Sequence, residues 1–300
     1  MLNNLNWPIA VFDSRVCRLG EGPVWDQVRA RVVWVDILQS AVLWRSWSGS
    51  EAGGWVLDRH VGAVLPKQDG GWLLSLPDGV YSTVTGQDVG AGDLGLVCKF
   101  PHAQDFTDMG LPRLRANDAK VSPDGVAYLG SMPYDPVADA GSAALYALVG
   151  EQLQTVVSGV TISNGIAWSP DGSTMYYIDS PTGYVDRCTM DAASAQLQRE
   201  PFIAIDPALG VPDGMCVDSE GFLWVAIWGG GRVQRFTPDG AAAGHICVPC
   251  PQVTSCTFAG PDLKTLVITT AADGLATQDG VGMTYAVECP VAGQPQPLVA

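Results

Sequence analysis

The sequence predicts an all-β fold, a six-bladed β-propeller, and three observations support this. Short runs of apolar and β-branched residues alternate with turn signals throughout the 300 residues, and glycine (35) and proline (21) are abundant. We find no convincing amphipathic helix, meaning no 12-residue window that combines an i, i+3, i+4, i+7 apolar pattern with helix caps. The third observation, a unit that occurs six times, selects the architecture among all-β folds.

The repeated unit is a short apolar run, a tight turn and a second run rich in aromatic or β-branched residues. Its copies are GPVWDQVRARVVWVDI (22–37), AVLPKQDGGWLLSL (63–76), AKVSPDGVAYLGSM (119–132), IAWSPDGSTMYYID (166–179), MCVDSEGFLWVAIW (215–228) and CTFAGPDLKTLVIT (256–269). The turns fall near residues 28, 69, 124, 171, 220 and 262, so the spacing is about 41 to 55 residues, which is typical of propeller blades.

Ring closure explains why such a unit would be repeated. A single hairpin cannot bury both of its faces, whereas twisted sheets packed in a ring bury them and protect their edges. We therefore expect residues 1–300 to form one six-bladed propeller domain. Residues 8–12 could add a strand to the blade made by the other end of the chain.

The composition argues against several partners. Aspartate and glutamate number 31 against 16 lysines and arginines, and this net charge of −15 repels nucleic acid and anionic membranes. No apolar run reaches the roughly 18 residues of a membrane span, and residues 1–15 lack a signal-peptide pattern. The eight scattered cysteines suit reduced thiols, and we expect no redox or metal role for the lone pair Cys247 and Cys250. These features favour a cytoplasmic protein, while the oligomeric state stays open.

Counting back seven residues from each predicted turn reveals a set of polar positions. They are Glu21, Gly62, Asn117, Asn164, Asp213 and Ser255. The first strand of each propeller blade lies along the central channel, so equivalent positions in different blades should converge at one mouth of it. Four of the six carry a carboxylate or an amide, and glycine follows three of them, which lets the backbone turn tightly there.

Asp213 belongs to a Pro-Asp-Gly tripeptide that also occurs at 77–79, 123–125, 170–172 and 238–240. Taken alone, such an aspartate is most often a turn or cap residue. In this repeat, however, the hairpin turn is predicted at 219–221, seven residues later. The register therefore places Asp213 at the channel mouth and not in the hairpin turn.

Two carboxylates and two amides at one place imply a cation. Like charges that are close together and partly buried are unfavourable unless something neutralises them. The donors are all oxygen atoms, which favours Ca²⁺, Mg²⁺ or Mn²⁺. The chain has only three histidines, none in a metal motif, so a histidine-rich zinc site or a Ser-His-Asp triad is not expected.

Longer motifs at these positions resemble the SMP-30/gluconolactonase/LRE family of regucalcin-like lactonases. They are LGEGPVW (19–25), RANDAK (115–120), ISNGIAWSPDG (162–172), YYIDS (176–180), VPDGMCVDSEGFLWVA (211–226), GGGRVQRF (229–236) and TSCTFAGPD (254–262). The resemblance implies a six-bladed propeller with one divalent metal ion in the central channel. Ca²⁺ is favoured, with Zn²⁺, Mn²⁺, Mg²⁺ or Fe²⁺ as alternatives.

The resemblance also implies roles for individual residues. It marks Glu21, Asn164 and Asp213 as metal ligands, and Arg115 and Asn117 as substrate contacts. A further substrate contact, a glutamate in the family, is replaced here by Asp135. Trp228, Tyr134 and Asp179 are additional candidates for the site, although a structural role suits each of them as well.

The implied activity is the hydrolysis of sugar lactones, such as glucono-, xylono-, galactono- or arabinono-lactone, to the aldonic acid. A metal ion can polarise the carbonyl, and a carboxylate beside it, for which we choose Asp213, can act as general base. The alternatives are a hydrolase of other esters or phosphotriesters and a non-catalytic calcium-binding propeller. A pure scaffold is disfavoured, because it has no need of converging carboxylates.

Overall fold

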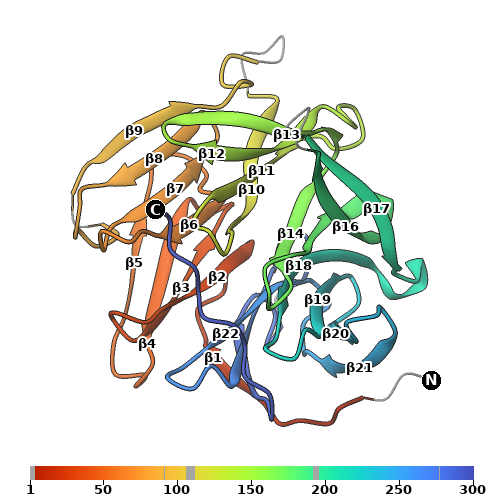
Figure 1. Ribbon diagram of the computed structural model, residues 1–300. Coiled ribbons are helices and arrows are strands. Elements are labelled where there is room, and N and C mark those ends of the chain that lie inside the picture. Colours follow the sequence, from red (N-terminus) through yellow and green to blue (C-terminus); the bar gives the residue numbers. More distant parts are fainter. Residues whose placement is uncertain (1–3, 91, 106–111, 192–195, 277) are drawn as a thin grey trace.

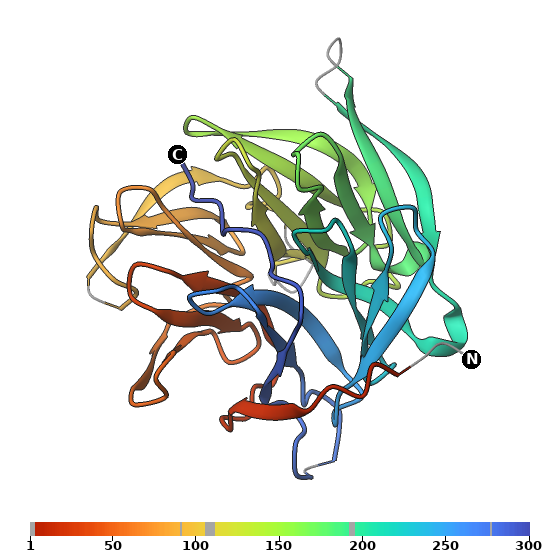
Figure 2. The same cartoon turned by 60° about the horizontal axis from the view of Figure 1, so that its bottom comes forward.

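The computed structural model describes residues 4–90, 92–105, 112–191, 196–276 and 278–300, so the first three residues considered for a signal peptide lie outside it. The strands found there form six four-stranded antiparallel sheets around a central channel (Figures 1 and 2). This arrangement confirms the predicted six-bladed β-propeller.

The blades are numbered in chain order, and each begins at the channel. Blade 1 contains β2 (Gly20–Asp26), β3 (Arg31–Asp36), β4 (Ala41–Ser46) and β5 (Ala52–Val56); blade 2 contains β6 (Ala63–Pro66), β7 (Trp72–Leu76), β8 (Gly79–Thr83) and β9 (Leu94–Lys99); blade 3 contains β10 (Leu114–Val121), β11 (Ala127–Pro133), β12 (Ala143–Val149) and β13 (Gln152–Val160). Blade 4 contains β14 (Ser163–Trp168), β15 (Met175–Asp179), β16 (Tyr184–Asp191) and β17 (Gln196–Ala204); blade 5 contains β18 (Val211–Val217), β19 (Leu223–Trp228), β20 (Arg232–Phe236) and β21 (Ala242–Cys247); blade 6 contains β22 (Val253–Ala259), β23 (Thr265–Thr270), β24 (Thr284–Glu288) and β1 (Ile9–Asp13).

All six predicted turns lie between the first and second strands of a blade. The ring is closed by the N-terminal strand, because β1 pairs antiparallel with β24, for example Ile9 with Val287 and Val11 with Tyr285. The expected contribution of residues 8–12 to the last blade is therefore confirmed. It joins the two ends of the chain in one sheet, which leaves the ring without an open blade.

The innermost strands β2, β6, β10, β14, β18 and β22 contact one another in a closed ring. Two glycines show how tightly they pack. A Cβ atom on Gly165 would come within 2.7 Å of the Asp213 carbonyl oxygen, and one on Gly214 would overlap the Ser255 side chain. Glycine is needed after Asn164 and Asp213 because the neighbouring strand leaves no room for a side chain.

Five of the six innermost strands carry a β-bulge in the part of the strand that lies near the channel mouth where these strands begin. The pairing with the second strand of the blade shifts at positions 21/24, 116/119, 164/166, 212/215 and 253/255. A bulge bends its strand and re-aims the side chains within it. The bulges coincide with Glu21, Asn117, Asn164 and Asp213, so the backbone is irregular at the positions that the sequence singled out.

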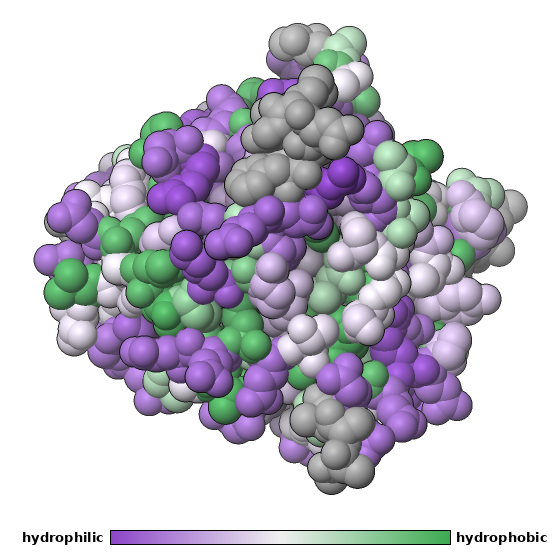
Figure 3. Space-filling view, turned by 90° about the horizontal axis from the view of Figure 1, so that it is seen from above, coloured by the Kyte–Doolittle hydropathy of each residue, from purple (hydrophilic) through white to green (hydrophobic). Residues whose placement is uncertain are grey.

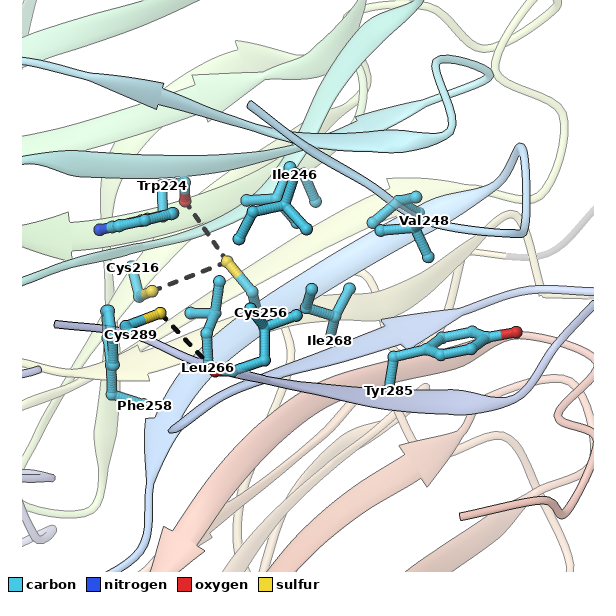
Figure 4. Packing of buried hydrophobic residues seen from close by; sticks show 14 of the residues in the cluster. Cys216, Trp224, Ile246, Val248, Cys256, Phe258, Leu266, Ile268, Tyr285 and Cys289 are labelled. Carbon is cyan, nitrogen blue, oxygen red and sulfur yellow. Dashed lines mark hydrogen bonds between the residues drawn. The ribbon is translucent and has the colours of Figure 1, made fainter. Parts of the chain in front are cut away.

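Hydrophobic clusters fill the space between neighbouring blades. Figure 4 shows the cluster of blades 5 and 6, in which Trp224 and Tyr285 are buried and the Cys216 and Cys256 sulfur atoms lie 3.6 Å apart. All eight cysteines are free thiols, including the exposed Cys247 and the buried Cys250. The six buried cysteines thus act as small apolar residues in the core.

The outer surface of the ring mixes hydrophilic and hydrophobic residues, as Figure 3 shows from above. The helical elements of the described chain are two short 3₁₀ turns, η1 (Ser180–Thr182) and η2 (Pro207–Leu209). Among the residues the structure covers, no helix is long and apolar enough to cross a membrane.

Residues 292–300, which we call the C-terminal strap, cross the channel at the end where the innermost strands finish (Figures 1 and 2). The strap makes hydrogen bonds to five blades in turn. Its partners are Leu263 in blade 6, Ser219 in blade 5, Trp168 in blade 4, Gly125 in blade 3 and Pro66 in blade 2. Because these partners are far apart in sequence, the strap links the blades independently of their own sheets.

The close contact between Gly293 of the strap and Phe258 gives a first prediction. A Cβ atom at Gly293 would overlap the Phe258 side chain, so Gly293→Ala should displace the strap and lower the free energy of unfolding by about 1–3 kcal/mol. Urea unfolding measures this. Gly95→Ala on β9 is the control, because its Cβ would meet only the Ser82 carbonyl oxygen at 3.8 Å. Equal stability of the two variants would show that the strap accommodates a Cβ atom at position 293, contrary to this prediction.

Candidate active site

A cavity of about 270 Å³ lies at the mouth of the channel where the innermost strands begin. Its walls come from blades 1, 3, 4 and 5. The lining residues are Leu19, Glu21, Arg115, Asn117, Met132, Ile162, Asn164, Ser180, Val211, Asp213 and Trp228. The four polar residues that the repeat register brought together, Glu21, Asn117, Asn164 and Asp213, all line this one cavity.

Glu21 on β2 and Asp213 on β18 are the carboxylates of the cavity, and each is only 6% exposed. Burial, and after it the nearby Asp118, raise the pKa of Glu21 to about 8. Burial also raises the pKa of Asp213 well above its usual range, and Glu21 and Asp118 add to the effect. The ion pairs among the described residues involve other carboxylates, so no cation within 4 Å compensates either group.

Arg115 on β10 is the buried cation of the cavity. Burial lowers its pKa to about 10, while Tyr134, Glu21 and Asp213 oppose that shift. The guanidinium Nη1 donates hydrogen bonds to the Ala116 carbonyl oxygen (3.0 Å) and to Asn117 Oδ1 (2.7 Å). The side chain therefore stays charged at neutral pH and is held in place by its own strand.

The two amides of the cavity are joined to each other. Asn117 Nδ2 donates to Asn164 Oδ1 (3.0 Å) and to the Ser163 carbonyl oxygen (2.8 Å). Asn164 Nδ2 donates to the Ser180 hydroxyl (2.8 Å), which in turn donates to the Pro212 carbonyl oxygen (2.7 Å). A continuous line of hydrogen bonds thus crosses blades 3, 4 and 5.

These residues fit a divalent cation. The cavity presents two carboxylates and amide oxygens but no thiol or imidazole, and this set of oxygen donors suits a hard ion. The two carboxylates lack a close counter-charge, and a cation between them would remove the cost of ionising both. In the described chain no cluster of three or more His, Cys, Asp or Glu side chains could hold a metal, so an amide oxygen would have to complete the set.

Of the remaining residues considered from the sequence, one lines the cavity and three do not. Trp228 lines the cavity. Asp135 does not line it; the side chain is exposed and accepts the backbone N–H groups of Val137 and Ala138 in its own loop. Tyr134 and Asp179 also lie outside the lining: Tyr134 bonds His60, and Asp179 accepts the N–H groups of residues 161 and 162.

Two residues near the site were not predicted from the sequence. Asp118 is buried beside Asn117, and burial raises its pKa, an effect that Lys120 partly offsets. The signal was present, since Asp118 stands where the other three strands have glycine. Ser180 links Asn164 to the backbone next to Asp213. The only sequence feature that could have indicated it was its position in the YYIDS motif.

The raised pKa of Glu21 predicts how stability depends on pH when no metal is bound. Its folded pKa of about 8 exceeds the ordinary 4.5, so the stabilisation is present below pH 4.5 and is lost as pH rises towards 8. In EDTA, the wild type should therefore lose more unfolding free energy between pH 5 and 8 than Glu21→Gln, by an amount on the order of a few kcal/mol.

Urea titrations at the two pH values provide this comparison. The other titrating groups are common to both proteins, and removal of the Glu21 charge also relieves part of the raised pKa of Asp213, which adds to the difference. Adding a divalent cation at pH 8 should restore the wild type, since metals bind deprotonated carboxylates. Parallel pH profiles for the wild type and Glu21→Gln would contradict the assignment.

Comparisons with known proteins agree with this fold. The model of the SMP-30/gluconolactonase/LRE-like region matches residues 19–272. Pentonolactonase XacC of Haloferax volcanii is 33% identical over 93% of this chain and 94% of its own, and regucalcin of Xenopus laevis is 32% identical over 87% and 86%. The crystal structure of regucalcin, a calcium-binding protein from Agrobacterium tumefaciens, superposes with a TM-score of 0.90 at 27% identity, covering both chains fully. The chain therefore belongs to the SMP-30/gluconolactonase/LRE-like family of lactonases and regucalcins.

Proposed function

We propose that the protein is a metal-dependent hydrolase that opens sugar lactones to aldonic acids. One observation carries the proposal: two buried carboxylates without close counter-charges and a buried arginine face one small cavity. Its volume, about 270 Å³, lies just below the roughly 300–1,000 Å³ of pockets for drug-sized ligands, which suits a small molecule.

Glu21, Asn164 and Asp213 would hold the divalent cation. When bound, the ion would act as a Lewis acid that polarises the lactone carbonyl. Ca²⁺ is the first choice for this set of oxygen donors, and Zn²⁺, Mn²⁺, Mg²⁺ or Fe²⁺ are alternatives. The proposal also accounts for the raised pKa values, because the same burial that disfavours two bare carboxylates strengthens their attraction for a cation.

Asp213 serves as the general base. Its carboxylate takes a proton from the attacking water while the water oxygen bonds to the lactone carbonyl carbon. Arg115 donates hydrogen bonds to the oxygen on which negative charge develops. When the ring C–O bond breaks, the proton held by Asp213 passes to the departing alkoxide oxygen. One water is consumed, and the product carries a carboxyl group and a new hydroxyl.

The substrate hydroxyls would be oriented by polar groups around this centre. Asn117, whose Oδ1 accepts a hydrogen bond from Arg115, would contact a hydroxyl near the cation. Trp228 and Met132 offer apolar walls for the sugar ring. Asp135 lies three residues beyond Met132, so in this proposal it meets only the outer end of a bound lactone. Eight free thiols support a reducing, cytoplasmic location.

An acid-release assay tests the reaction. Glucono-, xylono-, galactono- and arabinono-lactone should each be offered with Ca²⁺, Zn²⁺, Mn²⁺, Mg²⁺ or Fe²⁺, and acid release followed with a pH indicator. We expect turnover with at least one ion and its loss in EDTA. Metal binding without acid release would favour a non-catalytic calcium-binding propeller, and activity confined to other esters or phosphotriesters would favour the other hydrolase.

Asp213→Asn tests the base. The substitution keeps the shape of the side chain but removes its ability to accept the proton, so kcat should fall by at least about 100-fold. Asp239→Asn is a matched control, because Asp239 belongs to another Pro-Asp-Gly and accepts the Thr237 hydroxyl in an exposed turn. A variant at position 213 that folds and keeps near wild-type turnover would exclude Asp213 from this role.

A further inference from the structure

Ser180 is the last side chain in a line of hydrogen bonds that has only one possible direction. Arginine can only donate and a backbone carbonyl oxygen can only accept, and these two groups terminate the line at Arg115 and Pro212. Because Arg115 donates to Asn117 Oδ1, the Asn117 amide nitrogen must point to Asn164. It donates there to Oδ1, and this leaves the Asn164 amide nitrogen to donate to Ser180.

The Ser180 hydroxyl completes the pattern. It accepts the Asn164 amide at 2.8 Å and gives its single proton to the Pro212 carbonyl oxygen at 2.7 Å. The side chain is 4% exposed and lines the cavity, so bulk water cannot readily replace either bond. If the Asn164 amide were flipped, its nitrogen would face the Asn117 amide nitrogen. Its oxygen would then face Ser180, and if the Ser180 hydroxyl donated to that oxygen, the Pro212 carbonyl oxygen would lose its donor.

Local capping does not explain these contacts. Ser180 opens the 3₁₀ turn η1, but the cap position is Asp179, which makes no side-chain cap bond. The local bonds of the turn are made by other groups: the Thr182 hydroxyl donates to the Asp179 carbonyl oxygen, and the Gly183 N–H donates to the Ser180 carbonyl oxygen. Ser180 reaches sixteen residues back to Asn164 on β14 and thirty-two residues ahead to Pro212 on β18. Its hydroxyl joins two blades.

The two partners of Ser180 both adjoin the proposed cation site. Asn164 Oδ1 uses one lone pair for Asn117 and keeps the second, while Pro212 is the residue directly before Asp213. One hydroxyl thus controls the orientation of one proposed ligand and anchors the backbone of another. Groups that orient metal ligands in this way typically change metal affinity when they are removed.

We propose that Ser180 is a positioning residue of the cation site: it fixes the Asn164 amide with its oxygen available to the ion and holds the β18 backbone at Asp213. The inference rests on the proposed function in one respect, namely that the cavity binds a divalent cation. It does not depend on which substrate is hydrolysed.

The test measures metal affinity directly. Ser180→Ala should bind Ca²⁺ and Mn²⁺ about 10–100-fold more weakly than the wild type in calorimetric titrations, with a matching loss of kcat/KM on a reactive lactone. Ser131→Ala is the matched control. Ser131 is a buried serine of blade 3 whose hydroxyl also makes two hydrogen bonds, to the Ala144 N–H and carbonyl groups, outside the cavity lining.

The control separates positioning from a general loss of stability. Both variants should melt at lower temperature in EDTA, but Ser131→Ala should keep wild-type metal affinity within about twofold. Should Ser180→Ala fail to fold, Ser180→Cys retains a side chain with a weak donor and should show an intermediate loss of affinity.

Wild-type affinity in Ser180→Ala, or an equal loss in Ser131→Ala, would overturn the positioning role while leaving the lactonase proposal intact. Weakened metal binding in Ser180→Ala, together with a wild type that opens no lactone, would uphold the role of Ser180 and overturn the proposed reaction. A wild-type protein that binds neither of these ions nor Zn²⁺, Mg²⁺ or Fe²⁺ would overturn both.

Discussion

The close approach of the innermost strands is the constraint on which the rest of the structure depends. At Gly165 a side chain would strike the Asp213 carbonyl oxygen at 2.7 Å, and at Gly62 one would meet the Ala116 backbone at 2.6 Å. The ring therefore leaves no space between strands for the side chains at the channel mouth. The bulges turn Glu21 and Asp213 into the channel, where water is scarce. The raised pKa values of these carboxylates are a consequence of how the blades pack.

A fold that buries uncompensated carboxylates must be stable for other reasons. The six hydrophobic clusters between the blades, with Trp34, Trp72 and Trp224 fully buried, provide most of that stability. The pairing of β1 with β24 and the C-terminal strap hold the ring closed. Packing over the whole ring thus stabilises the folded state, while the buried carboxylates at one mouth destabilise it. A cation bound at that mouth would offset part of this destabilisation.

The sequence predicted the fold because a propeller repeats its unit, so six weak signals reinforce one another. It predicted that Glu21, Asn117, Asn164 and Asp213 converge, because the blade register alone brings them to one mouth. Arg115 was predicted from the family resemblance alone. It stands two residues before Asn117, and since alternate residues of a strand point to the same face, the strand pattern could have indicated it. Asp135 and Ser180 follow the second strand of their blades, where loop geometry, which the repeat does not specify, decides what a side chain reaches.

The strap covers the end of the channel opposite the cavity. Beneath it the channel keeps a space of only about 70 Å³, lined by Lys120, Trp168 and Cys216 among others, which is too small for a sugar lactone. In the proposed reaction, substrate, product and the attacking water would therefore all use the mouth formed by Glu21, Asn117, Asn164 and Asp213. A carboxylic acid released there would meet two carboxylates on its way out. With a divalent ion in place the local charge is close to neutral, so the ion that would favour the chemistry also prevents the product from being repelled into the channel.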